Sequence, residues 1–568
     1  MKILFIVPSS ISFEDMLFKS EGGKQHDKTE LLNKIKQQLR SSTYGPHFPM
    51  GPLSIAAYIK KFYKDIEIVI LDFTLIACKA ADDAEFNILD AGREDFWTYC
   101  LNLMNGFTPD IIGIAGMFSS LYYELPVLSS FLKSKYINTI IICGGHFPSA
   151  CYKEILETST TINAVCFGEG EIPFKQLVEA YQQKAVFKYF EENNSWITHK
   201  KMGGGGGINL TNQLIIDLDE IPPFELNIIA GYELYAHYRN RLFRETMTGT
   251  KLEYFTTRGC PGHCVFCASH NVHGHKVRYH SVERVKSDIK KYITEYNIDE
   301  IIFQDDHFLA KKQRALDILN FIVENNYKAD IAVLAFFSID EDIADVLKNL
   351  KLEAIGITIE SGNPTTLKNI IHKPGDLNTA KKAVEILRKR GFMIFTNILT
   401  GLPGETKESI QIGFDNLIDI GCNWATFYTA APLPGSELYD ICKKNDYLIK
   451  EADVFKMNFT RCLIQTPDFS PEYITKKNYE MNLSLNFVQN YDMRHENYKT
   501  ALILFERVFT YIAPDHAFAY YFAAKCAAEL GLAVKYHDYR LKYEAIKTES
   551  DFWQEWIAYF KLEPLNRE

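Results

Sequence analysis

The sequence predicts an α/β fold in three parts: an N-terminal doubly wound parallel sheet, a central partial β/α barrel and a C-terminal α-helical domain. Three observations lead to this prediction. The 568 residues suffice for roughly three to four domains at about 150 residues each. Short apolar segments alternate with helical segments over residues 1–180 and again over 250–440, as is typical of parallel sheets. From about residue 450 the pattern changes to helices rich in Tyr, Phe and Ala.

The first part, residues 1–185, is predicted to be Rossmann-like. Its short apolar segments are the expected strands, namely Lys2–Val7, Ile66–Leu71, Ile111–Ala115, Ile140–Cys143 and Ala164–Phe167. Two of them end in glycine turns, at Gly144-Gly145 and at Gly168-Glu169-Gly170-Glu171. Ligands of such sheets bind beyond the carboxyl ends of the strands, where glycine lets the backbone approach them closely. Glycines that only turn the chain would give the same pattern.

The remaining chain divides into a linker, a barrel and a helical domain. Residues 186–245 are the predicted linker, and Gly203 to Gly207 disfavour a stable helix or strand there. Residues 246–445 hold six expected strands: Glu253–Thr257, Glu300–Gln304, Ile331–Ala335, Ala354–Ile359, Met393–Thr400 and Trp424–Thr429. Ser281 is the expected N-cap of the helix that follows it. Six βα units predict a TIM-like partial barrel with functional residues at the strand C-termini. Residues 446–568 are predicted to be helical, and their aromatic residues favour a packed core over an apolar ligand site.

Composition excludes several classes of protein. Apolar residues make up 47% and charged residues 24% of the chain, which is ordinary for a globular protein and excludes wholesale disorder. The net charge of −10 disfavours nucleic acid as a partner, because that affinity comes from clustered Lys and Arg. The apolar runs are too short to span a membrane, and Met1–Pro8 does not resemble a signal peptide. We therefore expect a cytoplasmic protein whose twelve cysteines do not form a disulfide framework.

Three cysteines cluster in one short segment. Cys260, Cys264 and Cys267 form C-x3-C-x2-C just after the first expected barrel strand. Three thiolates on one loop can bind a soft metal or an iron–sulfur cluster. A structural zinc needs four protein ligands, and nearby histidines could supply the fourth. The spacing and the position at a strand end favour a [4Fe–4S] cluster, because no second cysteine pair follows.

This motif resembles that of the radical SAM enzymes, in which an aromatic residue, here Phe266, precedes the last cysteine. Further matching pieces stand at expected strand ends: Gln304-Asp305-Asp306-His307-Phe308, Glu360-Ser361-Gly362, Gly401-Leu402-Pro403-Gly404-Glu405-Thr406 and Pro432-Leu433-Pro434-Gly435-Ser436. The resemblance covers roughly residues 250–445. It implies a [4Fe–4S] cluster on the three cysteines, one open iron that chelates S-adenosylmethionine (SAM), and reductive cleavage of SAM to methionine and a 5′-deoxyadenosyl radical.

The same resemblance implies a set of SAM contacts. They are Phe266, Gln304, Asp305, Asp306, Glu360, Ser361, Gly362, Thr400 and Leu402. Asp305 or Asp306 is expected to hold the ammonium group of SAM, and Glu360 a ribose hydroxyl, since carboxylates accept charge-assisted hydrogen bonds. Capping of a solvated turn is the alternative role of the two aspartates.

Residues 1–225 resemble the B12-binding domains fused ahead of radical SAM domains. The matching pieces are Gly51-Pro52-Leu53-Ser54, Gly144-Gly145-His146-Phe147-Pro148, Gly168-Glu169-Gly170-Glu171 and Asp219-Glu220-Ile221-Pro222-Pro223. The resemblance implies cobalamin contacts at Gly51, Pro52, Leu53, Ser119, Gly144, Gly145, His146, Gly168, Glu169 and Gly170. The D-x-H-x-x-G motif, whose His ligates cobalt in many such domains, is missing. Cobalamin would therefore lack a histidine ligand from that motif.

Together the two resemblances imply a cobalamin-dependent radical SAM enzyme. We expect methyl transfer to an unactivated carbon of a small molecule, supported by an external reductant such as flavodoxin or ferredoxin. A radical cyclase, a rearrangement or an oxidative reaction with the same cofactors is the first alternative. Methylthiotransfer is a second, although a further three-cysteine set is not seen in the N-terminal part. A zinc-stabilised scaffold without enzymatic activity is the third.

Overall fold

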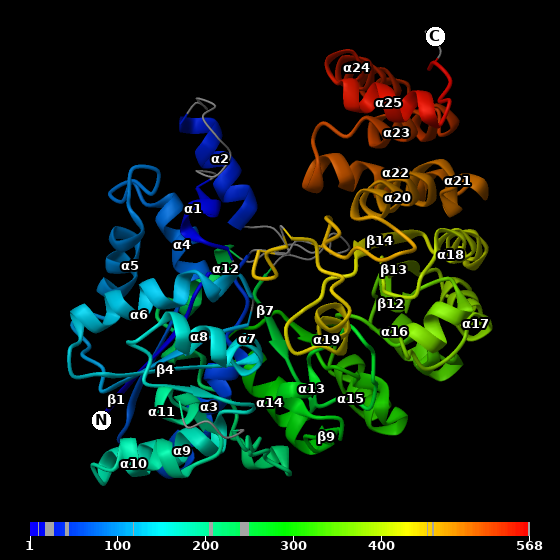
Figure 1. Ribbon diagram of the computed structural model, residues 1–568. Coiled ribbons are helices and arrows are strands. Elements are labelled where there is room, and N and C mark those ends of the chain that lie inside the picture. Colours follow the sequence, from blue (N-terminus) through cyan, green and yellow to red (C-terminus); the bar gives the residue numbers. More distant parts are fainter. Residues whose placement is uncertain are drawn as a thin grey trace. The chain divides into compact units, whose positions relative to one another are not determined.

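The computed structural model describes residues 1–9, 11–17, 28–39, 45–117, 119–203, 208–238, 249–450, 452–456 and 459–565 (Figure 1). Most of the predicted five-glycine run, Gly204 to Gly207, lies outside these ranges. The chain forms two compact units. The first unit comprises residues 1–332, 432–446 and 450–458, and the second comprises 333–431, 447–449 and 459–568. No helix among the described residues is long and apolar enough to cross a membrane.

The first unit begins with a six-stranded sheet in the order β2-β1-β3-β4-β5-β6. Its strands are β1 (Lys2–Val7), β2 (Glu67–Asp72), β3 (Ile111–Ala115), β4 (Ile140–Gly144), β5 (Ala164–Cys166) and β6 (Trp196–Ile197). The five predicted strands are present and parallel. The sixth, β6, pairs antiparallel with β5 and lies inside the predicted linker. Its two residues are too few for a periodic signal in the sequence.

Helices cover both faces of this sheet, because successive side chains of a strand point to opposite sides. Leu4 and Ile6 of β1 pack in a core with α4 (Phe73–Asp82), α5 (Arg93–Asn102) and α6 (Glu124–Lys135). Phe5 packs on the other face, with its ring centroid 5.1 Å from that of Phe174 in α9 (Glu171–Gln182). Helix α9 in turn contacts α3 (Met50–Phe62). The sheet is therefore doubly wound, as predicted.

The first unit also contains a parallel sheet in the order β11-β10-β7. Its elements are β7 (Lys251–Tyr254), α14 (Val282–Glu295), β10 (Glu300–Phe303), α15 (Lys312–Glu324) and β11 (Ala329–Ile331). The Ser281 side chain caps α14 by accepting from Arg284 N, as expected. The strand predicted over Ile331–Ala335 instead lies earlier in the chain, at Ala329–Ile331. The strand ends at Ile331, where its register against β10 stops. Leu334 already belongs to the second unit, within which it makes an isolated bridge to Ile357.

The second unit holds a parallel sheet in the order β12-β13-β14. Its strands are β12 (Ala354–Glu360), β13 (Met393–Thr400) and β14 (Trp424–Thr429), joined through α17 (Leu377–Arg388) and α18 (Lys407–Ile420). Asn486 covers the edge of β14: its side chain accepts from Ala425 N at 2.8 Å and donates to Ala425 O at 2.7 Å. An amide side chain thus replaces a neighbouring strand at this position.

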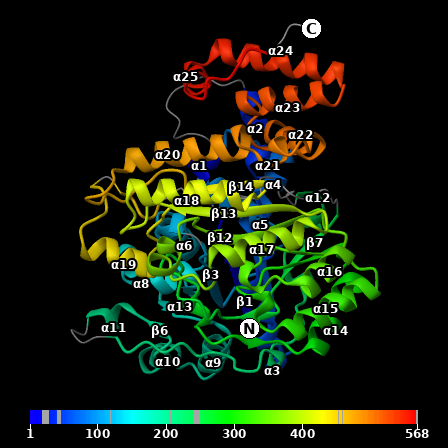
Figure 2. The same cartoon turned by 90° about the vertical axis from the view of Figure 1, so that its right-hand side faces the viewer.

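The C-terminal part of the second unit is helical, as predicted. Its α-helices are α20 (Pro471–Leu483), α21 (Tyr491–Arg494), α22 (Tyr498–Arg507), α23 (Ala517–Glu529), α24 (Ala533–Glu549) and α25 (Asp551–Tyr559). Figure 2 shows α22, α23 and α24 in successive layers, and each contacts the next. Phe487, Phe505 and Phe518 are fully buried here. The aromatic residues of this region therefore build a packed core.

Candidate functional site

The cysteine motif lies on a loop whose two ends are tied together. Strand β8 (Thr257–Arg258) enters the loop and β9 (Arg278–Tyr279) leaves it, and the two pair antiparallel. Between them stands the short helix α13 (His270–His273). Gly259 follows β8 with φ of 90°, and a Cβ there would lie 2.6 Å from Lys276 O. Only glycine fits this position, where the loop turns toward the cysteines.

The three cysteines are partly exposed, and two of them approach each other across Gly262. A Cβ placed on Gly262 would lie 3.4 Å from Sγ of Cys260 and 3.8 Å from Sγ of Cys264, so these two sulfur atoms approach the same point. Cys267 N donates to Cys264 O at 3.0 Å, which curls the loop. Among the residues that the structure describes, no three His, Cys, Asp or Glu side chains converge around a single metal ion. Three thiols on one curled loop fit the donor set of an iron–sulfur cluster, which is a larger group.

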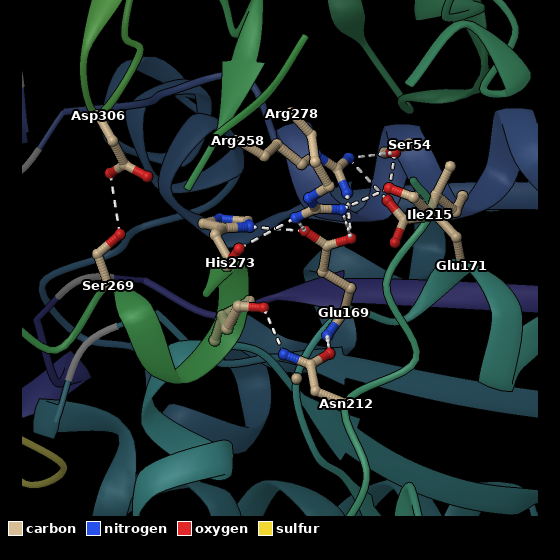
Figure 3. Close-up of polar contacts among 12 residues, drawn as sticks. Ser54, Glu169, Glu171, Asn212, Ile215, Arg258, Ser269, His273, Arg278 and Asp306 are labelled. Carbon is tan, nitrogen blue, oxygen red and sulfur yellow. Dashed lines mark hydrogen bonds and ion pairs between the residues drawn. The ribbon is translucent and has the colours of Figure 1, made fainter. Parts of the chain in front are cut away.

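A buried carboxylate joins this loop to the N-terminal sheet domain (Figure 3). Glu169 follows β5, and its side chain is 2% exposed. Arg278 Nη1 and Nη2 donate to its two oxygens at 2.9 and 2.5 Å. Arg258 Nη1 lies 3.2 Å from Glu169 Oε2, and His273 Nδ1 lies 2.9 Å from Oε1. Glu169 therefore contacts both strands that close the cysteine loop and the helix within it.

A second carboxylate extends this network. Glu171 Oε1 accepts from Arg258 Nη2 at 2.8 Å and from Ser54 Oγ at 2.5 Å. Ser54 belongs to α3, so Arg258 connects the cysteine loop to two elements of the sheet domain. We call Glu169, Glu171, Arg258, Arg278 and His273 the clamp. Burial alone would raise the pKa of Glu169, but the charge of Arg258 and hydrogen bonds from Arg278 and His273 hold it well below its usual range.

Backbone contacts strengthen the same junction. The Asn212 side chain accepts from Glu169 N at 3.0 Å and donates to Val272 O at 2.7 Å. Gly168 has φ of 78°, and a Cβ there would lie 2.1 Å from Asn212 Oδ1. A single amide therefore bridges the glycine turn after β5 and the helix of the cysteine loop. The glycine at position 168 is explained by this close approach.

The predicted cobalamin contacts gather around the carboxyl ends of the strands, apart from those in α3. Gly51, Pro52 and Leu53 lie in the first turn of α3, and Ser119 begins the short helix η1 (Ser119–Tyr122) after β3. Gly144, Gly145 and His146 follow β4, while Gly168, Glu169 and Gly170 follow β5. At Gly145 a Cβ would lie 2.4 Å from Gly116 O, and at Gly170 it would lie 2.6 Å from Ile55 Cδ1. The backbone contact therefore requires glycine at position 145, whereas at position 170 the end of the Ile55 side chain is free to turn away.

His146 brings one of these loops close to the cysteine loop. Its ring centroid lies 5.4 Å from that of His273, edge to face. Burial lowers the pKa of His146 to about 4, and the nearby charge of His273 acts in the same direction while Asp306 opposes it. The imidazole is therefore neutral at pH 7.

The two adjacent aspartates after β10 differ in their surroundings. Asp305 is buried and accepts from Thr256 Oγ1 at 2.9 Å; burial raises its pKa to about 6, although Thr257, Thr256 and Arg314 lower it. Asp306 is exposed and accepts from Ser269 Oγ at 2.9 Å (Figure 3). Ser269 stands two residues after Cys267. Of the pair, Asp306 is the one that faces the cysteine loop with a solvent-accessible carboxylate, and Gln304 beside them is partly exposed.

The other expected SAM contacts lie in the second unit, at the ends of β12 and β13. Ser361, Gly362 and Thr400 line one small pocket together with Glu405. Glu360 has φ of 70° at an irregularity in the β12–β13 pairing, and Lys373 Nζ lies 3.3 Å from its Oε1. A non-glycine residue held in the left-handed region marks a candidate functional position. Leu402 is fully buried just after the β13 turn.

Glu405 organises that turn, although the motif around it had not singled it out. Its Oε2 accepts from Gly401 N at 2.8 Å and Leu402 N at 2.9 Å. Burial raises its pKa to about 7, although both backbone hydrogen bonds act against this. The functional residues that the sequence did not assign to the site are therefore Glu405, Glu171, Arg258 and Arg278, whereas His273 is one of the nearby histidines considered as a zinc ligand. Glu171 and Ser54 stood in quoted motifs and Arg258 stands two residues before Cys260, whereas nothing in the sequence marks Arg278.

Comparisons with known proteins agree with this layout. Residues 254–412 match the radical SAM superfamily, and residues 39–178 match the B12 binding domain. A cytidylyl-2-hydroxyethylphosphonate methyltransferase of Streptomyces wedmorensis is 24% identical over 78% of this chain and 87% of its own length. An uncharacterized methyltransferase of Pyrococcus horikoshii is 28% identical over 67% of this chain and 79% of its own.

A solved structure shares the fold over nearly the whole length. It is the radical S-adenosylmethionine methyltransferase TsrM of Kitasatospora setae, solved with cobalamin and a [4Fe-4S] cluster bound. The TM-score is 0.57 at 13% identity, covering 97% of this chain and 99% of that one. The cysteine loop lies within the matched radical SAM domain, and the glycine turn that it contacts lies within the matched B12 binding domain. This chain is therefore a radical SAM enzyme that carries a B12-binding domain ahead of its radical SAM domain.

Proposed function

We propose that this enzyme is a cobalamin-dependent radical SAM methyltransferase that methylates an unactivated carbon of a small molecule. The observation that carries the proposal is the clamp, because it bonds the glycine turn of the B12-binding domain to the loop of the three cysteines. Such direct contact suits an enzyme in which both cofactors serve one reaction. Both relatives described above are named as methyltransferases, which supports the same function.

The residues divide the work as follows. Cys260, Cys264 and Cys267 would hold a [4Fe–4S] cluster, whose bound form supplies the electron that cleaves SAM. Asp306 is placed to accept a hydrogen bond from a cationic group beside the cysteine loop. Within the second unit, the Glu360 carboxylate and the pocket at Ser361 and Thr400 are the polar groups expected to contact SAM. His146, whose pKa is lowered to about 4 mainly by burial, adds no positive charge of its own after β4 at pH 7.

One assay tests the proposal against a cyclase or rearrangement enzyme and against a zinc-stabilised scaffold. The protein is purified and reconstituted without oxygen, and iron, sulfide, zinc and cobalt are measured. After reduction with SAM present, a methyltransferase releases both 5′-deoxyadenosine and S-adenosylhomocysteine. A cyclase or rearrangement enzyme releases 5′-deoxyadenosine without S-adenosylhomocysteine. Zinc without sulfide, together with intact SAM, would contradict the whole proposal.

The cysteine assignment has its own test. Cys264→Ala removes one of three thiolates from the loop, and we expect it to abolish cluster binding because two ligands cannot hold the cluster. Iron and sulfide analysis measures this, and Cys442→Ala, a buried cysteine of α19 (Glu437–Lys444), is the matched control. Unchanged iron content in Cys264→Ala would refute the assignment.

A further inference from the structure

Among the residues that the structure describes, Glu169 is a buried, multiply bonded carboxylate that the proposed chemistry leaves unused. Two guanidinium groups and one imidazole surround it, at distances of 2.5 to 3.2 Å. Glu169 and the Arg278 side chain are each 2% exposed, so water screens this charge only weakly. Both oxygens of Glu169 are taken up by protein partners. The same carboxylate therefore does not need a cofactor to explain its burial.

The partners of Glu169 are the residues that fix the cysteine loop. Arg258 ends β8, two residues before Cys260, and Arg278 begins β9 after the loop. Arg278 also donates to His273 O at 3.1 Å and to Ile215 O at 2.6 Å. Removing the charge of Glu169 leaves the buried Arg278 guanidinium and the Arg258 guanidinium, whose side chain is 14% exposed, with one fewer anion. Such a loss is strongly destabilising for the local structure, because a buried charge without its partner is costly.

We propose that Glu169 is a positioning residue, which anchors the cysteine loop on the B12-binding domain and sets the reduction potential of the cluster through its charge. This inference rests on the proposed function only in requiring a cluster on the three cysteines. It assigns Glu169 to the cluster side of the junction, whereas the family resemblance implied a cobalamin contact. In this role, the glycine turn after β5 holds the cysteine loop of the radical SAM domain against the B12-binding domain.

The charge argument gives a direction. The Glu169 carboxylate opposes the positive charge of Arg258 and Arg278 near the cluster, so its loss makes the surroundings more positive. A more positive site favours the added electron, and the cluster potential rises. Because the groups are buried, the interaction acts through a medium of lower dielectric constant than water and is not screened away.

Three variants separate anchoring from charge. Glu169→Gln keeps the shape and removes the charge. In the double variant Glu169→Gln/Arg278→Gln, one negative and one positive charge are removed, so the local net charge is restored while the anchor remains broken. Glu192→Gln, whose carboxylate is exposed and pairs with Lys188 on the surface, is the matched control. Each reconstituted protein is measured for iron per chain, for the rate of iron removal by a chelator, for cluster potential by redox titration with electron paramagnetic resonance, and for hydroxocobalamin affinity.

We expect Glu169→Gln to lose iron at least threefold faster than wild type and to raise the cluster potential. The double variant should lose iron equally fast with a potential closer to that of wild type. Cobalamin affinity should stay within twofold in all of them. If Glu169→Gln does not fold, Glu171→Gln, which removes only one partner of Arg258, should give smaller changes in the same directions.

Two results would overturn the inference. One is wild-type iron retention and potential in Glu169→Gln. The other is a tenfold loss of cobalamin affinity with an unchanged cluster, which would place the carboxylate at cobalamin. Failure of the proposed function is distinct, because it appears in the wild-type protein as the absence of iron, sulfide and SAM cleavage.

Discussion

Three buried carboxylates of this chain show how surroundings decide protonation. Glu169 lies between two guanidinium groups, which hold its pKa well below the usual range against the effect of burial. Glu405 accepts only backbone hydrogen bonds, and burial raises its pKa to about 7. Asp305 stands between these cases, with a pKa raised by burial to about 6. All three carboxylates are buried, so the nearby positive charge, more than the degree of burial, decides whether a carboxylate stays ionised or titrates near neutral pH.

Glu405 predicts a dependence of stability on pH. Its pKa in the folded chain, about 7, lies above the ordinary 4.5, so between these values the folded state binds a proton that the unfolded state has released. The contribution of protonated Glu405 to the free energy of unfolding is complete below pH 4.5 and is lost as pH rises to about 7. Glu405→Gln mimics the protonated form. We expect its stability relative to wild type to increase from pH 5 to pH 8, by up to roughly 3 kcal/mol.

Thermal unfolding of both proteins at the two pH values measures this difference. Glu408→Gln, an exposed residue in the first turn of α18, is the control and should show no such trend. A constant difference between Glu405→Gln and wild type across the range would mean that Glu405 does not titrate there.

Substituting the two aspartates after β10 should have different effects, on stability for Asp305 and on SAM binding for Asp306. Asp305→Asn removes a buried charge near Arg314, and we expect it to lower the free energy of unfolding by about 1–3 kcal/mol. Asp306→Asn removes an exposed carboxylate beside the cysteine loop. We expect little loss of stability but roughly tenfold weaker SAM binding, as for one charge-assisted hydrogen bond. Chemical denaturation and equilibrium dialysis of SAM on the reconstituted protein measure the two effects. Equal SAM affinity in Asp306→Asn and wild type would remove this aspartate from the SAM site.

At the scale of elements, the sequence predicted what is local and periodic. Ten of the eleven expected strands stand within a few residues of their predicted bounds, because continuous apolar runs between helical segments have few other interpretations. Strand β11 was misplaced because the run Ile331–Ala335 reads as a strand although pairing with β10 ends at Ile331. Strand β6 was missed because it exists only through its pairing with β5.

The candidate site follows the same rule. Cys260, Cys264 and Cys267 were visible as a spacing, and the glycine turns as local motifs. The clamp was not, because Glu169 and Arg278 are 109 residues apart and no periodicity links them. The reason for glycine at position 168 also lies in a distant residue, because the side chain of Asn212 packs against it. Contacts between distant segments are set by tertiary packing, which a single sequence does not display.

The junction between β12 and α18 predicts the effect of one added methyl group. A Cβ on Gly362 would lie 2.0 Å from Gly413 O and 2.8 Å from Leu417 Cγ, both on α18. Gly362→Ala must therefore push the helix away from the strand end, and we expect this to lower the free energy of unfolding by about 1–3 kcal/mol. Gly203→Ala is the control, because a Cβ there meets nothing within 4 Å. Urea denaturation measures both, and equal midpoints for the two variants would contradict the packing seen at Gly362.

At the scale of the whole molecule, the chain divides its predicted cofactor residues between two compact units. The cysteine loop and every predicted cobalamin contact lie in the first, while Glu360, Ser361, Gly362, Thr400 and Leu402 lie in the second. The boundary at residues 332 and 333 falls between β11 and β12, and so between the two three-stranded sheets. Ligands confined to one unit should therefore act on that unit first.

This division predicts an unequal response to cobalamin. A ligand that binds only the folded state stabilises it by about 2.7 kcal/mol at a concentration one hundred times its dissociation constant. We expect hydroxocobalamin at that excess to raise the unfolding temperature of the first unit and to leave that of the second nearly unchanged. Scanning calorimetry gives the transitions, and hydrogen exchange assigns them, with peptides around β4 and β5 gaining protection and peptides of α22 to α25 serving as the internal control. In Glu169→Gln the cobalamin shift should persist, because the carboxylate serves the cysteine loop; equal protection of both units, with binding demonstrated, would show that cobalamin is not held by the first unit alone.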